Sequence, residues 1–347
     1  MARCIAIIGD NFMLPDMFAA AIEEACGGRE LAVDRHTLPW PDEPMEHGYA
    51  VAGLAGLKEY QGSAEETIAM IGEAELLVTH LAPLSREMFE RLPSLKFVAV
   101  SRGGPVNIDM EAAREHRVRV VNTPGRNAGA VAEFTIGAIL AETRNISRGH
   151  DALRRGDWRG DLYRADTTGR ELSEMTVGVV GYGQIGTRVV KLLRAFGCRI
   201  VVTDPYVQLS RDDAEAGVEH VALGDLLARS DVVTLHPRVT AETTGMFDAD
   251  AFARMKTGAS FVNTARGPLV DYEALADALE RGHLRGAMLE TFAIEPVPAD
   301  WRLLTMPNVT LTPHIAGASL RTVKIAAGQA GEEVRRYLSG EPPVNPC

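Results

Sequence analysis

The chain has 347 residues, 46% of them hydrophobic, which is enough apolar material for the cores of two ordinary domains. The formal net charge of −11 argues against a nucleic-acid partner, because phosphate binding needs a basic surface and Lys and Arg form no extended run. The four cysteines have neither metal-ligand nor disulfide-framework spacing, so we expect no bound metal and a reducing compartment.

No segment has the character of a targeting or membrane sequence. The apolar run at residues 4–9 is too short for a signal peptide and has no small-residue cleavage site. The longest apolar stretch, residues 128–141, is interrupted by Glu133 and falls short of the roughly 20 residues that a bilayer span needs. We therefore expect a cytoplasmic protein without a membrane span.

Apolar runs typical of strands alternate with segments of helical period, the pattern of parallel sheets covered by helices on both faces. In the first third, strands are predicted at residues 5–8, 31–33, 76–79, 97–100 and 118–121. Helices are predicted there at residues 16–25, 65–71, 85–91 and 110–114. Residues 39–60 contain three prolines and are predicted to be a long connection.

A second series of elements follows the breaker Thr123-Pro124-Gly125. Its strands are predicted at residues 176–180, 199–203, 218–221, 232–235, 259–263, 284–288 and 309–311. Its helices are predicted at residues 184–196, 223–228, 249–254 and 272–281. Two sheets are therefore expected, each with its own helices.

Two further helices stand outside this alternation. Residues 128–143 are apolar on almost all sides, so they either lie buried between domains or form a subunit interface, and the sequence does not decide between these. Residues 320–338 form an amphipathic helix after the second sheet is complete. This last helix can fold back on the first domain.

The clearest motif is the glycine turn Gly181-Tyr182-Gly183-Gln184-Ile185-Gly186, between a predicted strand and a predicted helix. Its glycines permit a tight turn, close approach of the backbone to a pyrophosphate and packing of the helix on the sheet. The next strand ends at Asp204, 18 positions after Gly186, where a carboxylate accepts hydrogen bonds from ribose hydroxyls and repels a 2′-phosphate. Together these features predict an NAD site.

Three residues later in the chain supply what the reversible oxidation of an alcohol requires. Taken singly, Arg266 reads equally well as a surface cation, and Glu295 and His314 as structural residues. Taken together, His314 exchanges the hydroxyl proton, Glu295 pairs with the imidazole and favours its charged form, and Arg266 holds the acid and polarises the carbonyl.

Four ordered segments resemble the signatures of the D-isomer-specific 2-hydroxyacid dehydrogenases, and within that family the phosphoglycerate dehydrogenase-like branch. They are residues 179–186, 262–267, 290–296 and 312–317, within a resemblance that extends over about residues 76–338. The resemblance implies an α/β protein of two Rossmann-like, doubly wound parallel-sheet domains. It implies a discontinuous substrate-binding domain, residues 1–122 and 316–347, an NAD-binding domain, residues 123–315, and a homodimer formed through residues 128–143.

The resemblance also implies the site residues. His314 is the acid/base, Glu295 its partner and Arg266 the substrate clamp. The implied NAD contacts are Gly181, Gly183, Gln184, Ile185, Gly186, Asp204, His236, Thr264, Ala265, Arg266, Glu290 and His314. The implied substrate contacts are His80, Arg102, Gly103, Gly104 and Arg266, with backbone N–H groups of residues 101–104 receiving the substrate carboxylate.

The sequence departs from the family pattern at several of these places. Glu290 stands where an Asp usually holds the nicotinamide carboxamide, and Arg238 replaces a common Pro near the cofactor. Arg126 is larger than the residue often found there, and His80 stands where phosphoglycerate dehydrogenases place an Arg.

The resulting functional hypothesis is an NAD-dependent oxidoreductase acting on a small polar 2-hydroxy or 2-oxo acid, with or without a phosphate. Two alternatives remain open at this point: an NAD(H)-sensing binding protein of the corepressor type, and a phosphite-type dehydrogenase that uses the same three residues.

Overall fold

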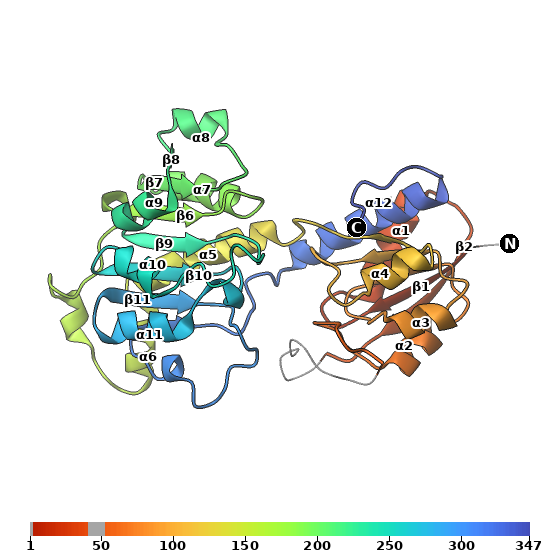
Figure 1. Ribbon diagram of the computed structural model, residues 1–347, viewed down its shortest axis with the longest axis horizontal. Coiled ribbons are helices and arrows are strands. Elements are labelled where there is room, and N and C mark those ends of the chain that lie inside the picture. The colour runs from red at the N-terminus through yellow and green to blue at the C-terminus, as the bar shows by residue number, and fades with distance from the viewer. Residues whose placement is uncertain (1–2, 41–52) are drawn as a thin grey trace. The chain divides into compact units, whose positions relative to one another are not determined.

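The computed structural model describes residues 3–40 and 53–347, so the predicted connection at residues 39–60 lies partly outside the described residues. The chain divides into two compact units (Figure 1). The terminal unit comprises Met1–Asn127 and Ser319–Cys347, and the central unit comprises Ala128–Ala318. The first unit is thus built from both ends of the chain, with the central unit inserted between them in the sequence.

The terminal unit is a five-stranded, fully parallel sheet in the order β2-β1-β3-β4-β5. The strands are β1 (Arg3–Gly9), β2 (Leu31–Thr37), β3 (Leu76–Thr79), β4 (Phe97–Val100) and β5 (Arg119–Val121). The helices are α1 (Pro15–Cys26), α2 (Ala64–Ile71), α3 (Arg86–Arg91), α4 (Met110–Glu115) and α12 (Leu320–Leu338). Because every pair is parallel, the carboxyl ends of all five strands lie at one edge of the sheet.

The final helix α12 packs against α1 (Figure 1) and also contacts β4. At Gly331 a Cβ atom would lie 2.7 Å from the carbonyl oxygen of Ala21 in α1, so only glycine allows the two helices to approach this closely. Val323, Ala326 and Val334 are buried in the same cluster as Phe18 and Ile22 of α1. The apolar side of residues 320–338 therefore packs into the core of the terminal unit, as the amphipathic pattern predicted.

The central unit holds a seven-stranded parallel sheet in the order β12-β11-β10-β9-β6-β7-β8. The strands are β6 (Thr176–Val180), β7 (Arg199–Thr203), β8 (Glu219–His220), β9 (Val232–Leu235), β10 (Ala259–Asn263), β11 (Leu284–Leu289) and β12 (Val309–Leu311). The α-helices are α5 (Ala128–Thr143), α6 (Ile146–Arg154), α7 (Gly186–Arg194), α8 (Arg211–Glu215), α9 (Leu223–Arg229), α10 (Ala249–Arg254) and α11 (Tyr272–Glu280). Short 3₁₀ turns are η1 (Gly160–Tyr163), η2 (Leu172–Glu174), η3 (Gly267–Leu269) and η4 (Arg302–Leu304).

The apolar helix α5 packs on α7 and on strands β10 and β11 of its own unit. One side, including Val131, Thr135 and Ile139, is buried, so most of its apolar surface serves the core of the central unit. Gly129, Glu133 and Gly137, spaced four residues apart, lie on the exposed side. Helix α5 therefore packs against its own sheet, and a subunit interface on its exposed side stays a prediction.

The observed divisions between the units, at 127/128 and 318/319, fall a few residues after the expected 122/123 and 315/316. Backbone hydrogen bonds hold the segment after β5 to the terminal unit. The N–H of Asn122 donates to the Asn345 carbonyl at 3.1 Å, and the N–H of Thr123 donates to the Arg102 carbonyl at 2.9 Å. The Thr123-Pro124-Gly125 breaker therefore ends a strand without ending the domain.

Two helices were missing from the sequence prediction. Helix α6 starts after Asn145, whose φ of 58° reverses the chain directly behind α5, and α8 has only five residues. Helix α7 begins at Gly186, two residues later than predicted, because Gln184 and Ile185 belong to the glycine turn.

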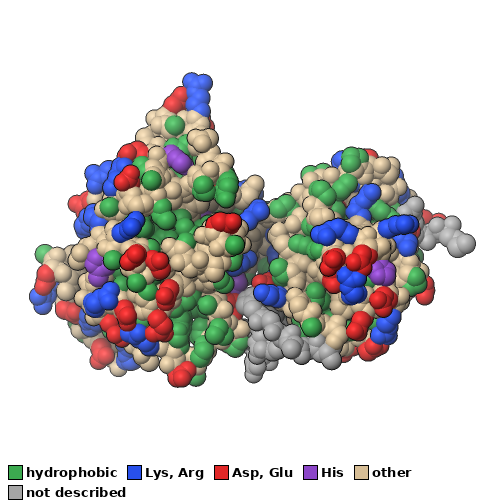
Figure 2. Space-filling model, viewed as in Figure 1, with side chains coloured by type: hydrophobic (Ala, Val, Ile, Leu, Met, Phe, Trp, Pro, Cys, Tyr) green, Lys and Arg blue, Asp and Glu red, His purple; other side chains and the backbone are tan. Residues whose placement is uncertain are grey.

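On the face shown in Figure 2, acidic and basic side chains are interspersed over both units. Within residues 3–40 and 53–347, no helix is both long enough and apolar enough to cross a membrane. No cluster of three or more His, Cys, Asp or Glu side chains suited to a metal ion occurs in that part of the chain.

Candidate active site and dinucleotide site

The glycine turn links β6 to α7 at the carboxyl edge of the central sheet. Gly181 has φ of 91°, and a Cβ there would lie 2.9 Å from the carbonyl carbon of His236, which follows the neighbouring strand β9. A Cβ at Gly186 would lie 2.0 Å from the Gly181 oxygen. Both glycines are therefore required by the fold of the turn itself.

Gly183 differs from these two, because a Cβ there would meet nothing within 4 Å. No acceptor in the described part of the chain pairs with the backbone N–H groups of Gly183, Gln184 and Ile185. Free N–H groups before a helix, beside a position open to close approach, fit the pyrophosphate of a dinucleotide.

Asp204 follows β7, and both of its carboxylate oxygens accept backbone hydrogen bonds. Oδ2 accepts from the N–H of Tyr182 in the glycine turn at 2.8 Å, and Oδ1 accepts from Tyr206 and Val207 at 2.8 and 2.9 Å. Each oxygen has lone pairs left for ribose hydroxyls. The carboxylate therefore shapes the turn and also presents a negative charge next to it.

His236 directly follows β9, the strand that pairs with β6 before the turn. Its Nε2 is 3.2 Å from the Thr234 hydroxyl, whereas Nδ1 is buried without a partner among the described residues. Burial lowers the pKa of His236 to about 3, so the ring is neutral at physiological pH. An unpaired buried nitrogen beside the glycine turn is the kind of polar atom that a bound dinucleotide can satisfy.

The turn after β10 presents Arg266. The side-chain amide of buried Asn263 accepts from the Ala265 N–H at 3.0 Å and donates to the Arg266 carbonyl at 3.1 Å, which fixes the turn. The Thr264 hydroxyl lies 2.8 Å from that of Thr135, tying the same turn to α5. Arg266 itself is exposed, and its Nη1 donates to the Ala265 carbonyl at 2.8 Å.

His314 and Glu295 are brought together from two loops of the central unit. Nδ1 of His314 is 2.8 Å from Oε2 of Glu295, and Oε1 of Glu295 accepts from the Phe292 N–H at 2.8 Å. Because a carboxylate only accepts, His314 carries its proton on Nδ1, and its Nε2 is left as the basic nitrogen. His314 has φ of 53°, a left-handed conformation that costs a non-glycine residue roughly 1 kcal/mol and is typical of functional positions.

Glu290, the departure from the family pattern, has a structural contact. Its carboxylate is 1% exposed and accepts from the Ala316 N–H at 2.8 Å, while its carbonyl accepts from the His314 N–H at 3.0 Å. Burial raises the pKa of Glu290, opposed by the charge of His314 and by the Ala316 hydrogen bond. Glu290 thus holds the His314 loop against the end of β11.

The candidate carboxylate-binding loop follows β4 in the terminal unit. The backbone N–H of Arg102 donates to the Val100 carbonyl at 2.8 Å, and the guanidinium of Arg102 pairs with Glu59. The N–H groups of Gly103 and Gly104 pair with no acceptor in the described part of the chain, and a Cβ at either would meet nothing within 4 Å. The loop therefore offers the N–H groups of Gly103 and Gly104, and the substrate contact of Arg102 stays a prediction.

His80 follows β3 at the same edge and is 4% exposed. Its Nδ1 lies 2.7 Å from Oδ2 of Asp10, which follows β1, and its Nε2 lies 3.4 Å from Nη2 of Arg126. Sequence reasoning singled out His80 and Arg126 but missed Asp10. A polar residue directly after the apolar first strand was the available signal.

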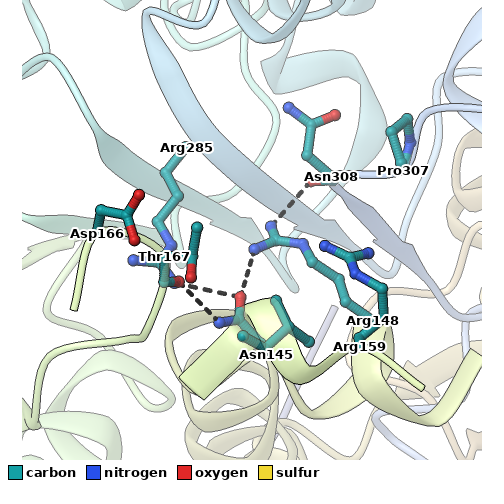
Figure 3. Close-up of a pocket in the computed structure, with 9 residues that line it drawn as sticks. Asn145, Arg148, Arg159, Asp166, Thr167, Arg285, Pro307 and Asn308 are labelled. Carbon is teal, nitrogen blue, oxygen red and sulfur yellow. Dashed lines mark hydrogen bonds between the residues drawn. The ribbon is translucent and has the colours of Figure 1, made fainter. Parts of the chain in front are cut away.

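A cavity of about 340 Å³ lies elsewhere in the central unit. Figure 3 shows Arg148 and Asn145 facing Arg285, and Asn308 contributes to the same wall. Arg285 is near the start of β11 and Asn308 precedes β12, so this cavity lies at the amino edge of the sheet. The glycine turn, Arg266 and His314 all follow strands at the opposite, carboxyl edge.

Known proteins resemble both units. Residues 136–316 match the family model described as D-isomer specific 2-hydroxyacid dehydrogenase, NAD binding domain. The glyoxylate reductase of Korarchaeum cryptofilum is 36% identical over 286 residues, which cover 82% of this chain and 85% of that protein. The D-3-phosphoglycerate dehydrogenase of Mycobacterium tuberculosis is 39% identical over 278 residues, 80% of this chain but 52% of that protein, so this chain spans about half its length.

The crystal structure of the TT0316 protein from Thermus thermophilus has 31% sequence identity and a TM-score of 0.77, covering 98% of this chain and 99% of that one. The family model covers more than half of the chain, and the glyoxylate reductase match covers most of both proteins. The chain belongs to the D-isomer specific 2-hydroxyacid dehydrogenase family.

Proposed function

We propose that this protein is an NAD-dependent D-2-hydroxyacid dehydrogenase that interconverts a small polar 2-hydroxy acid and its 2-oxo acid in the cytoplasm. The observation that carries the proposal is the His314–Glu295 pair, with Arg266 at the same sheet edge. NAD is the cofactor of the matched domain, and when bound it accepts the hydride from C2 or returns it.

In this proposal the catalytic roles follow from the hydrogen bonds. Nε2 of His314 takes the hydroxyl proton as C2 is oxidised and gives it back in reduction. Glu295, anchored by the Phe292 N–H, keeps the imidazole in the required tautomer and stabilises its cationic form. Arg266 polarises the carbonyl oxygen and holds the acid, and the N–H groups of Gly103 and Gly104 receive the carboxylate.

We further propose that the cofactor contacts lie along the glycine turn, Asp204, His236 and the residues around Arg266. The free N–H groups of Gly183, Gln184 and Ile185 would hold the pyrophosphate, and Asp204 would hold the ribose. We assign Glu290 to positioning of the His314 loop in addition to any contact with the carboxamide, because its carboxylate is occupied by the Ala316 N–H.

A homodimer is also proposed. The exposed side of α5 carries the small residues Gly129 and Gly137, and the chain beyond it exposes Ile146, Leu153, Trp158 and Tyr163, with Tyr163 95% exposed. Large exposed apolar side chains grouped along one segment are typical of protein–protein contact. We propose that a second copy covers them.

The test of the function is NADH consumption by the purified chain with glyoxylate, hydroxypyruvate, 2-oxoglutarate and 3-phosphohydroxypyruvate. Turnover of one or more of these acids, abolished in His314→Ala, is expected. Tight NADH binding without turnover of any acid would instead favour the sensor hypothesis, and reduction of NAD by phosphite would favour the phosphite dehydrogenase.

A further inference from the structure

A buried relay of side chains crosses the carboxyl edge of the terminal sheet. Asp10 is fully buried, and its Oδ1 accepts from the N–H groups of Phe12 and Met13 at 2.8 and 2.7 Å. Its other oxygen, Oδ2, lies 2.7 Å from Nδ1 of His80. The carboxylate can only accept, so His80 carries its proton on Nδ1 and presents a lone pair on Nε2.

Arg126 lies at the end of this relay. Its Nη2 is 3.4 Å from Nε2 of His80, a long hydrogen bond in which the guanidinium donates. Burial lowers the pKa of Arg126 to about 10, against the attraction of Asp10, so the side chain remains charged at neutral pH. Within residues 3–40 and 53–347, no carboxylate lies within ion-pair distance of this guanidinium.

The neutral imidazole of His80 lies between the carboxylate of Asp10 and the guanidinium of Arg126. Asp10 therefore orients Arg126 through the ring without forming a direct ion pair with it. The planar fork of the guanidinium, which suits a carboxylate or phosphate, keeps most of its donors available. A partly buried cation held in this way is costly unless an anion joins it.

The relay lies beside the candidate carboxylate loop. β3 and β4 are neighbours in the sheet, and His80 and Gly103 follow their ends. The segment that carries Arg126 is bound to the loop by the Thr123 N–H, which donates to the Arg102 carbonyl at 2.9 Å. Phe12 covers the other side, with its ring centroid 6.0 Å from that of His80.

We propose that Arg126, oriented by Asp10 and His80, is a specificity residue that binds a second anionic group, carboxylate or phosphate, at the end of the acid remote from C1. The inference rests on the proposed function, because it names the substrate class of that site. Two separate sets of donors serve two anions: Gly103 and Gly104 receive the C1 carboxylate, and Arg126 receives the second group.

The experiment compares matched pairs of 2-oxo acids that differ in the second anion: 2-oxoglutarate against 2-oxopentanoate, and 3-phosphohydroxypyruvate against hydroxypyruvate. In one of the two pairs, the wild-type kcat/KM is expected to be at least about 10-fold higher for the acid that carries the second anionic group. Arg126→Gln should lower that value about 10- to 100-fold, mainly through KM, and change the monoanion value less than about threefold. The pair that responds tells carboxylate from phosphate.

The matched control is Arg114→Gln, which removes the same charge from an exposed position of the same unit and should leave both values unchanged. Equal kcat/KM values for the acids with and without the second anionic group, or an equal loss for both in Arg126→Gln, would overturn the inference while leaving the proposed function intact.

If the protein turns over none of these acids, the proposed function is contradicted instead. Calorimetric titration of 2-oxoglutarate and of 3-phosphohydroxypyruvate into the NADH-bound protein would then decide the inference. Binding of one of them that weakens about 10-fold or more in Arg126→Gln supports it, and unchanged or undetectable binding of both refutes it.

Discussion

His314 and Glu295, 19 positions apart in the chain, are joined by a 2.8 Å hydrogen bond in which the imidazole Nδ1–H donates to a carboxylate that is only 9% exposed. The other Glu295 oxygen is held by the Phe292 N–H. Both oxygens are therefore engaged, and the pair leaves the proposed proton transfer to Nε2 of His314.

Glu295→Gln tests this pair. The amide still fills the space, but it does not carry the charge that stabilises an imidazolium, so we expect kcat to fall about 100-fold or more. NADH affinity, measured by fluorescence titration, should change less than about twofold. A variant with near wild-type kcat would refute the assigned role of Glu295, provided its thermal midpoint matches the wild type.

Gly183 and Gly186 form a matched pair for the dinucleotide turn. Gly186→Ala places a Cβ 2.0 Å from the Gly181 oxygen, so it should lower the unfolding midpoint as well as NAD affinity. Gly183→Ala meets no atom within 4 Å, so it should leave the midpoint unchanged and weaken NAD binding about 10-fold or more. Unchanged NAD affinity in a folded Gly183→Ala variant would place the pyrophosphate elsewhere.

Asp204→Ala tests cofactor choice. The change removes the negative charge beside the turn and leaves the Tyr182 N–H without its acceptor. We expect NAD affinity to fall about 10-fold, as for loss of a hydrogen bond to a charged group, and the preference over NADP to shrink. The measurement is kcat/KM for both cofactors, and an undiminished preference for NAD would show that other residues select it.

The buried side chain of His236 should make the folded protein less stable at acid pH. Its pKa is lowered to about 3 in the folded state and is near 6.5 when unfolded, so the unfolded chain binds the proton first as the pH falls. The contribution of His236 to the free energy of unfolding is therefore complete above pH 6.5. It is lost as the pH falls from 6.5 to about 3, by at most about 1.4 kcal/mol per pH unit.

Urea unfolding at several pH values in that range checks this sign. His236→Asn should show a shallower decline in stability than the wild type as the pH falls, and His150→Asn, at an exposed position, should not. Parallel curves for wild type and His236→Asn would mean that the ring titrates normally in the folded protein.

The proposed dimer makes a prediction about mass. One chain has a mass of 37.5 kDa, and light scattering of the wild type is expected to give twice that mass. Gly137→Glu places a charged side chain on the exposed side of α5, where a Cβ meets nothing within 4 Å, so it should yield a folded monomer. A wild-type monomer would contradict the proposal.

The sequence alone determined the elements and pointed to the candidate reacting groups. Every predicted strand segment is present, because a strand of a parallel sheet that is covered on both faces is a short continuous run of apolar residues. The glycine turn, Arg266, Glu295 and His314 were recognisable for the same reason: each follows a strand, and strand ends in a parallel sheet share one edge.

The tertiary structure decided which side chains meet. Asp10 and His80 are 70 positions apart, and Glu290 and Ala316 are 26 apart, so no local pattern records either contact. Arg102 pairs with Glu59, 43 positions away, a contact that the sequence did not indicate. The pattern of apolar residues in the sequence indicates which side of each element is buried. Hydrogen-bond partners depend instead on how strands and loops that are distant in sequence are brought together, which only the folded chain determines.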